Sequence, residues 1–385
     1  MDELGIYLQI PFCASKCTFC NFSSQVAPAA IFDRYADALV REIGARIGGP
    51  DRGNLSAETI YVGGGTPSLL GRERLERIFA ALQNRFSIEG AAESTLEITP
   101  GSADEKLLKA LLRLGVNRLS IGAQSFDDRE LRCVGRLHTA AEIDRQVLRA
   151  RRAGFGNVSL DLIAGLPHQS VASWQTSLQR AVRLRPEHLS VYLFEVDEKS
   201  RLGSETLRHG TLYSADAVPG DDFQAEAYER ARELLAGEGY AQYEISNFAL
   251  PGFESHHNQG YWQLKPYLGF GAGAHSFDGT RRWVNEISPE VYCDMVEKCE
   301  SPIADSRTLS QNEQVEEFFF LGLRQRRGVD LEQARGKWGN PPWNWWQARA
   351  SALKQEGWLE EDCGWLRLSQ RAFLVSNEVF QEFLE

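Results

Sequence analysis

The sequence contains no uninterrupted apolar run that approaches the roughly 18 residues needed to cross a bilayer. Its first residues, MDELGIYLQI, carry acidic side chains where a secretory signal carries basic ones. We therefore expect neither a membrane span nor secretion, and we predict a cytoplasmic protein. Disulfides are rare in the reducing cytoplasm, so the seven cysteines are expected to be free thiols.

The sequence also lacks an excess of positive charge. It has 42 Lys and Arg against 53 Asp and Glu, which gives a net charge of -11. Non-specific nucleic-acid binding depends on clustered Lys and Arg that neutralise phosphates. Nucleic acid is therefore not an expected partner.

A chain of 385 residues is too long for one small core, because single cores stop growing near ~250–300 residues. From Gly5 to about Val196, short β-rich runs alternate with amphipathic helical patterns, which is typical of βα units around a parallel sheet. We predict an α/β fold with a partial, open (β/α)6 barrel over residues 1–200. The six strand candidates are IYLQI, TIYVGG, STLEIT, RLSIGA, NVSLDLIAG and HLSVYLFEV.

Beyond the barrel the pattern changes twice. The stretch GSETLRHGTLYSADAVPG is predicted to be a loop, and residues 201–300 as a whole are predicted to extend the barrel. Residues 301–385 contain three helical patterns and a β pair, GWLEEDCGWLRLS, which predict a small winged-helix-like α+β domain. Such folds often bind DNA, but residues 310–385 hold more acids than bases, so we interpret this domain as structural or partner-facing.

Functional groups in parallel α/β sheets gather at the carboxyl ends of the strands. A cysteine loop follows the first strand candidate, and GGGTPS follows the second. Glu97, Gln124, Asp161 and Glu195 lie on or at the ends of the third to sixth candidates. We therefore expect polar and glycine-rich groups along one rim.

The cysteine loop, IPFCASKCTFCNF, contains Cys13, Cys17 and Cys20, whereas the other four cysteines are scattered. A structural zinc site uses four ligands and a disulfide uses two. Three thiolates can instead hold three irons of a 4Fe-4S cluster and leave the fourth iron an open position. The alternative is a zinc loop completed by a distant His or Cys.

The GGGTP run has two interpretations. Glycine lacks a Cβ, so the backbone can approach a ligand and turn its N–H and C=O groups toward it. A tight turn without a ligand has the same composition.

The spacing C-x3-C-x2-C, with an aromatic residue before the last cysteine, resembles that of the radical S-adenosylmethionine superfamily. The resemblance implies a 4Fe-4S cluster on Cys13, Cys17 and Cys20, whose open iron binds the amino and carboxylate groups of S-adenosylmethionine. It also implies that Gly64, Gly65 and Thr66 bind the amino group of that cofactor.

More narrowly, nearly the whole chain resembles the family that contains oxygen-independent coproporphyrinogen III oxidase and the heme chaperones. The resemblance implies that Tyr7 contacts the sulfonium region of S-adenosylmethionine and that Glu97 and Gln124 bind the cofactor. It assigns cofactor binding to Arg136 in VGRLHT and Asp161 in DLIAGLP as well. Taken singly, each of these polar residues is also compatible with a solvated or ion-paired surface position.

Two features separate the chain from the oxidase branch. The oxidases carry a further cysteine at the position of Phe22, and they lack HHNQGYW, His256–Trp262. That stretch, followed by GFGAGAHS, resembles the heme-chaperone branch, where an HNxxYW signature lies near bound heme. Neutral imidazole is a common heme ligand, so His257 is the first candidate, with His256 and His275 behind it. The alternative is a histidine that fastens a loop by hydrogen bonds.

Two classes of function follow from these features. The first is a heme chaperone that passes heme to an acceptor protein of unknown identity, for which a membrane-associated protein is one candidate. The second is a radical oxidase that decarboxylates coproporphyrinogen III. Phe22 and HHNQGYW favour the chaperone. A radical enzyme with another substrate stays open, because fold and cluster determine the cofactor and not the substrate.

Overall fold

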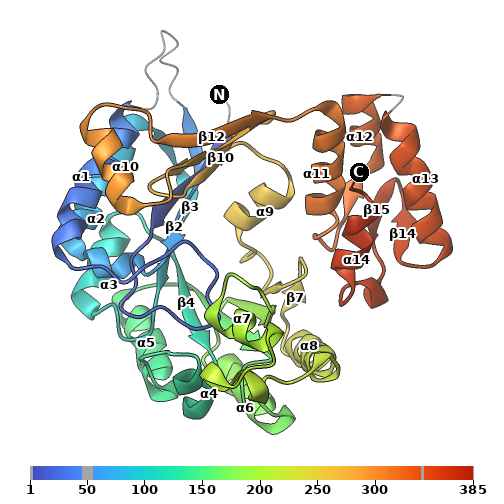
Figure 1. The fold of residues 1–385 in the computed structure, drawn as a ribbon, viewed down its shortest axis with the longest axis horizontal. Coiled ribbons are helices and arrows are strands. Elements are labelled where there is room, and N and C mark those ends of the chain that lie inside the picture. Colours follow the sequence, from blue (N-terminus) through green and yellow to red (C-terminus); the bar gives the residue numbers. More distant parts are fainter. Residues whose placement is uncertain (1–2, 46–54, 340–341, 385) are drawn as a thin grey trace.

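The computed structural model describes residues 3–45, 55–339 and 342–384 (Figure 1). It contains a large unit built on a 12-stranded sheet and a small unit built on a three-stranded sheet. The strand order in the large sheet is β12-β11-β10-β9-β1-β2-β3-β4-β5-β6-β8-β7. The two units carry separate hydrophobic cores.

Six parallel strands form the centre of the large sheet in chain order, which confirms the predicted partial barrel. The strands are β1 Glu3–Ile10, β2 Ser56–Gly64, β3 Ser87–Ile98, β4 Arg118–Gln124, β5 Asn157–Ala164 and β6 His188–Leu193. Helices connect them and cover the outer face of the sheet (Figure 1). These helices are α1 Ala30–Ala45, α2 Arg72–Arg85, α3 Glu105–Arg113, α4 Asp128–Cys133, α5 Ala140–Ala153 and α6 Val171–Arg183.

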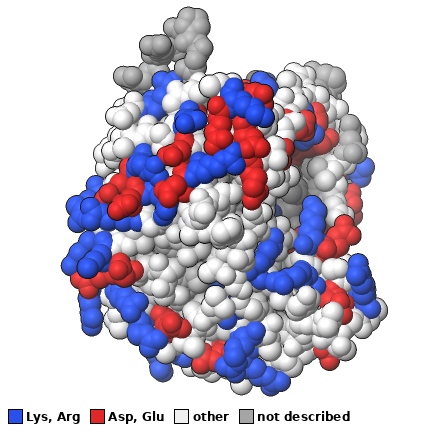
Figure 2. Space-filling view, turned by 60° about the vertical axis from the view of Figure 1, so that its left-hand side comes forward, with Lys and Arg blue, Asp and Glu red and all other residues white. Residues whose placement is uncertain are grey.

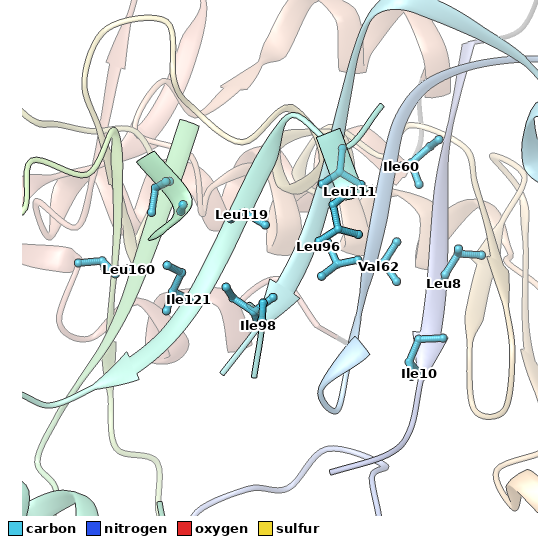
Figure 3. Close-up of a cluster of buried hydrophobic side chains, with 14 of the residues drawn as sticks. Leu8, Ile10, Ile60, Val62, Leu96, Ile98, Leu111, Leu119, Ile121 and Leu160 are labelled. Atoms are coloured by element: carbon cyan, nitrogen blue, oxygen red, sulfur yellow. The ribbon is translucent and has the colours of Figure 1, made fainter. Parts of the chain in front are cut away.

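The side chains of these strands alternate between two faces, because successive residues of a strand point in opposite directions. Those on the outer face are apolar and buried against the helices (Figure 3): Leu8, Ile10, Ile60, Val62, Leu96, Ile98, Leu119, Ile121 and Leu160. Their neighbours on the inner face include Tyr61, Glu97, Arg118, Ser120 and Asp161, which line a cavity. The interior of the barrel is therefore a polar site.

Residues 201–300 extend the sheet at both edges. On the β1 side lie β9 Tyr267–Phe270, β10 His275–Phe277 and β11 Arg281–Asn285; on the β6 side lie β8 Asn247–Ala249 and β7 Ala241–Gln242. The edge strand β12, Ile303–Thr308, also belongs to this sheet, so the small unit begins after it and not at residue 301. Helix α9, His256–Trp262, lies between the barrel strands and α11 (Figure 1), and α10, Pro289–Glu297, packs on α1.

The loop prediction for GSETLRHGTLYSADAVPG was wrong in part. Helix α7, Arg201–Leu207, and a 3-10 helix, Leu212–Ala217, occupy most of it. Ser200 caps α7, because its side-chain oxygen accepts a hydrogen bond from the N–H of Gly203 at 2.9 Å. The following helix α8, Asp221–Gly237, agrees with its prediction.

The small unit contains helices around an antiparallel sheet in the order β13-β15-β14. Its elements are α11 Gln311–Gly322, β13 Val329–Asp330, α12 Leu331–Trp338, α13 Pro342–Gln355, β14 Leu359–Asp362, β15 Trp365–Leu368, a 3-10 helix Gln370–Ala372 and α14 Ser376–Gln381. This is the α+β arrangement expected.

The charged side chains of the face drawn in Figure 2 are mixed in sign, with Lys and Arg beside Asp and Glu and uncharged surface between them. This face presents no continuous basic stripe. Within the described ranges, no helix has both the length and the apolar character needed to cross a bilayer.

Candidate functional site

A cavity of about 630 Å³ opens at the carboxyl ends of the barrel strands, under the cysteine loop. It brings together most of the residues predicted from the sequence: Cys13, Cys17, Cys20, Gly64, Gly65, Thr66, Glu97, Gln124, Arg136 and Asp161. Tyr7 and His257 do not line it. The rim expected from the strand order is therefore real.

The cysteine loop is fastened to its surroundings by backbone hydrogen bonds. The N–H of Cys13 donates to the carbonyl of Gln25 at 2.9 Å, and that of Thr18 donates to the carbonyl of Val134 at 3.1 Å. The N–H of Leu202 at the start of α7 donates to the carbonyl of Thr18 at 2.8 Å. The cysteine loop is therefore fixed by backbone contacts with the residue after α4 and with the start of α7.

The three thiols are partly exposed in the cavity. Burial raises the pKa of Cys13; a hydrogen bond with Ser24 opposes this and the neighbouring Cys20 adds to it. Among the described residues, no three His, Cys, Asp or Glu side chains come close enough to bind a single metal ion. Thiols of a mononuclear zinc site lie about 2.3 Å from one ion, whereas the thiolates of a cluster bind separate irons. Three thiols that line one cavity match a cluster that takes one thiolate on each of three irons and leaves the fourth iron open.

The glycine run packs directly against the cysteine loop. A Cβ on Gly65 would lie 2.5 Å from the carbonyl oxygen of Phe12, so only glycine fits there. The N–H groups of the run do not face a ligand as expected. Those of Gly64, Gly65 and Thr66 donate to the carboxylate of Glu97 and to the carbonyls of Ile10 and Phe12, at 3.1, 2.8 and 2.7 Å respectively. Backbone carbonyls and the Thr66 side chain are left to accept a ligand's amino group.

Glu97 lies on the inner face of β3. One carboxylate oxygen accepts a hydrogen bond from the hydroxyl of Tyr61 at 2.8 Å, and the other accepts the N–H of Gly64. Burial raises the pKa of Glu97 to about 7, although the Tyr61 hydrogen bond opposes the shift; the charge of Asp161 adds to it. Glu97 can therefore gain or lose a proton near neutral pH.

Gln124 and Arg136 stand together at the end of β4. Gln124 has a φ of 67°, a left-handed conformation that costs a non-glycine residue roughly 1 kcal/mol or more. Arg136 donates from Nη2 to the carbonyl of Gly122 and from Nη1 to the Sγ of Cys17 at 3.5 Å. Arg136 therefore links the strand end to the cysteine loop.

Asp161 on β5 is held by two hydroxyl groups. Ser190 donates to it at 2.8 Å and Ser120 at 3.1 Å. Burial raises its pKa, and the Ser190 hydrogen bond and the charge of Arg118 oppose that shift. These contacts place the carboxylate deep in the cavity.

Tyr7 lies beside the cavity lining and not within it. Its hydroxyl donates to the Gln9 side chain at 2.6 Å, and its ring stacks on that of Tyr61, with centroids 6.2 Å apart. Tyr61 lines the cavity and Tyr7 does not. In this arrangement Tyr7 packs against Tyr61, and its contact with S-adenosylmethionine stays a prediction.

His257 has the hydrogen-bonded arrangement that was the alternative to heme ligation. Its side chain is buried, Nδ1 is 2.7 Å from the Thr59 hydroxyl, and Nε2 is 2.8 Å from the Tyr261 hydroxyl. Burial lowers its pKa to about 3. Because an iron ligand needs a free ring nitrogen, this arrangement fastens α9 to the barrel and does not suit heme ligation. His256 and His275 are exposed.

Several cavity residues were not identified from the sequence: Tyr61, Arg118, Ser120, Ser190 and Tyr192. A signal for three of them was present. Tyr61 lies an even number of residues from Gly65, as Arg118 and Ser120 do from Gln124, so the period of two along a strand would have found these three. Ser190 and Tyr192 lie an odd number of residues from Glu195, so the same rule would not have found them.

The comparisons with known proteins agree with this geometry. Residues 7–181 match the family model of the radical SAM superfamily, and residues 309–375 match that of the HemN C-terminal domain. The chain is 35% identical over 382 residues to the heme chaperone HemW of Bacillus subtilis, covering 98% of each chain. It is 34% identical over 276 residues to HemW of Escherichia coli, covering 71% of this chain and 70% of that protein.

Among solved structures, coproporphyrinogen III oxidase of Escherichia coli is similar, with a TM-score of 0.85 and 23% identity. The likeness covers 99% of this chain and 90% of that one, and it establishes the fold. That protein is a radical SAM enzyme. Full-length similarity to the curated relatives goes further: the chain belongs to the radical SAM superfamily and, within it, to the family of the HemW heme chaperones.

Proposed function

We propose that the protein is a heme chaperone, which binds heme and passes it to an acceptor protein. The observation that carries this proposal is the similarity to relatives named heme chaperone HemW, which extends over 98% of the chain. The exposed Phe22 at the mouth of the cavity supports it, because the oxidase branch has a cysteine at that position. Coproporphyrinogen oxidation is not favoured, since the likeness to the oxidase is one of fold.

Cys13, Cys17 and Cys20 would hold a 4Fe-4S cluster, which would supply an iron with an open position for the amino and carboxylate groups of S-adenosylmethionine. The rest of that cofactor would contact Glu97, Gln124 and Asp161, and the carbonyls of the glycine run would accept its amino group. Arg136, hydrogen-bonded to Cys17 and to the carbonyl of Gly122, would fix the position of the thiolate relative to the end of β4. These residues bind and orient, and the proposal assigns none of them a chemical step.

For heme, the exposed His256 and His275 replace His257 as the proposed iron ligands. Neither imidazole has a hydrogen bond to another residue in the described ranges, so both have free nitrogens. The acceptor is a protein of unknown identity, and membrane association of that acceptor is part of the proposal. A reducing compartment such as the cytoplasm suits the seven free thiols.

The test is anaerobic reconstitution of the cluster, followed by two parallel assays. We expect stoichiometric heme retention after gel filtration and no conversion of coproporphyrinogen III. Cys17→Ala should lose most of its iron and sulfide, and the matched control Cys133→Ala, outside the cavity, should keep them. Robust coproporphyrinogen conversion by the wild-type protein would overturn the chaperone proposal in favour of the oxidase.

A further inference from the structure

Each thiol of the cysteine loop has a polar side chain within hydrogen-bond reach. Arg136 donates from Nη1 to the Sγ of Cys17 at 3.5 Å. The hydroxyl oxygen of Ser24 lies 3.9 Å from the Sγ of Cys20, and the same side chain hydrogen-bonds to Cys13. Ser24 therefore contacts two of the three thiols with one hydroxyl group, although it lies outside the C-x3-C-x2-C motif.

The backbone that carries Ser24 is fixed by two side chains. The Nζ of Lys16, between the first two cysteines, donates to the carbonyl of Phe22 at 3.2 Å and to that of Ser24 at 2.8 Å. The Nε2 of Gln9, on β1, donates to the carbonyl of Ser23 at 3.0 Å. Three consecutive carbonyls are thus bound by side chains, so the position of the Ser24 hydroxyl relative to the thiols is determined by the fold.

The chemistry of a hydroxyl group determines what Ser24 can do beside a thiolate. A serine hydroxyl has one proton to donate and two lone pairs that accept. Beside a neutral thiol either atom can be the donor. A thiolate that binds iron can only accept, so Ser24 must donate to it. Because the hydroxyl has a single proton, it serves Cys13 or Cys20 at any one time.

Hydrogen bonds to cysteine sulfurs are among the factors that set the reduction potential of an iron–sulfur cluster. Reduction adds one negative charge, and a donated hydrogen bond stabilises the reduced form more than the oxidised form. The effect is larger where water is excluded. Ser24 lines the cavity but is only 8% exposed, so solvent competes little for its proton.

We propose that Ser24 is a positioning residue for the redox state of the cluster: its hydroxyl donates to the thiolate of Cys13 or Cys20 and favours the reduced form. Lys16 and Gln9 act through Ser24, because they fix its backbone. The inference rests on the 4Fe-4S cluster of the proposed function and adds a residue that regulates it. Ser24 binds no iron in this role, and its proton stays on the hydroxyl.

The test is a redox titration of the anaerobically reconstituted full chain with dithionite and mediator dyes, followed by electron paramagnetic resonance. Ser24→Ala should keep its iron and sulfide, because all three thiolates remain. At a fixed potential its ratio of reduced to oxidised cluster should be about tenfold lower than in the wild type, which corresponds to about 59 mV for one electron. Ser24→Thr, which keeps a hydroxyl, should restore most of this ratio, and the exposed neighbour Ser23→Ala should behave as wild type.

Three results would overturn the proposal: equal potentials for the wild type and Ser24→Ala, an equal decrease in Ser23→Ala, or no recovery in Ser24→Thr. If Ser24→Ala loses its cluster, Ser24→Thr and Ser24→Val decide, because these two side chains have the same shape and differ in the hydroxyl. Equal cluster content and equal potentials in that pair would overturn the proposal. These outcomes all require a cluster in the wild type; a wild-type protein that takes up no iron and sulfide contradicts the cluster of the proposed function itself.

Discussion

At the scale of single residues, burial and neighbouring charges both shift the pKa values of the carboxylates that line the cavity. Two carboxylates, Glu97 and Asp161, face the same space as two guanidinium groups, Arg118 and Arg136. In each carboxylate the pKa is raised chiefly by burial. Such perturbed groups cluster at functional sites, because binding a ligand needs polar groups that the protein itself has not satisfied.

The raised pKa of Glu97 determines the direction in which the free energy of unfolding changes with pH. Its folded pKa of about 7 lies above the ordinary value of 4.5, so the folded state holds a proton that the unfolded state releases between these two pH values. The free energy of unfolding therefore falls as pH rises from about 4.5 to 7 and stays lowered above that range.

We predict that Glu97→Gln removes most of this pH dependence, because glutamine does not titrate. Between pH 5 and pH 8 the wild-type Tm should fall relative to that of the variant by about 2–4 °C or more. The reason is that a change of 1 kcal/mol in the free energy of unfolding shifts Tm by roughly this much in a protein of this size. Tm measured at both pH values checks it, with the exposed Glu238→Gln as control. Parallel pH profiles for wild type and Glu97→Gln would contradict the assigned pKa.

At the scale of elements, helix α9 closes one side of the barrel. The Glu93 carboxylate from β3 accepts the first N–H groups of the helix, where its dipole favours negative charge. His257 then bridges Thr59 on β2 and Tyr261 within the helix, and its ring stacks on Tyr61 with centroids 5.2 Å apart. The HHNQGYW segment is thus part of the barrel's architecture.

We predict different outcomes for the two adjacent histidines of α9. His257→Ala should lower the free energy of unfolding by about 2–3 kcal/mol, because two buried hydrogen bonds and a packed ring are lost. His256→Ala, at an exposed position, should stay within about 0.5 kcal/mol of wild type yet weaken heme retention. Denaturant midpoints and Soret titrations measure both effects. A stable His257→Ala protein without heme would restore His257 as the iron ligand.

The sequence predicted the barrel because the alternation of Leu119 and Ile121 with Ser120 and Gly122 is a local signal. The cavity followed from the rule that strand ends meet at one rim, which placed the cysteines, Gln124 and Asp161 together. The hydrogen bonds of His257 could not be predicted for a physical reason: its partner Thr59 is 198 residues away, and nothing local reveals that contact.

The same limit explains the other differences between prediction and structure. Tyr7 precedes the cysteine loop, but whether it or Tyr61 faces the ligand depends on packing between strands. Helix α7 lies in a stretch with glycine and polar residues, and its position depends on the contact between Leu202 and the carbonyl of Thr18 in the cysteine loop. Arg118 could be placed on the inner face, but the groups that surround it, Thr95, Glu93 and Asp161, could not be deduced from the sequence.

At the scale of the whole molecule, the small unit is docked onto the side of the barrel that carries α9. The N–H of Arg326 donates to the carbonyl of Tyr243 at 2.9 Å, and the guanidinium of Arg324 lies 4.6 Å from the centre of the Trp262 ring. Arg282 on β11 pairs with Glu317 on α11 through two contacts of 2.7 and 2.8 Å. The contacts reach the last residue of α9, so docking and the heme-site candidates are physically linked.

The Arg282–Glu317 pair should therefore hold the two units together. Its side chains are 24% and 18% exposed, so solvent screens it less than a surface pair. We predict that Arg282→Ala leaves Glu317 without its bidentate partner, separates the unfolding of the two units into distinct transitions and speeds limited proteolysis between β12 and α11. The control Arg349→Ala removes an exposed pair with Glu382 inside the small unit and should change neither measurement. Calorimetry and timed proteolysis distinguish the variants, and a single unshifted transition in Arg282→Ala would show that the backbone contact between Arg326 and Tyr243 is sufficient for docking.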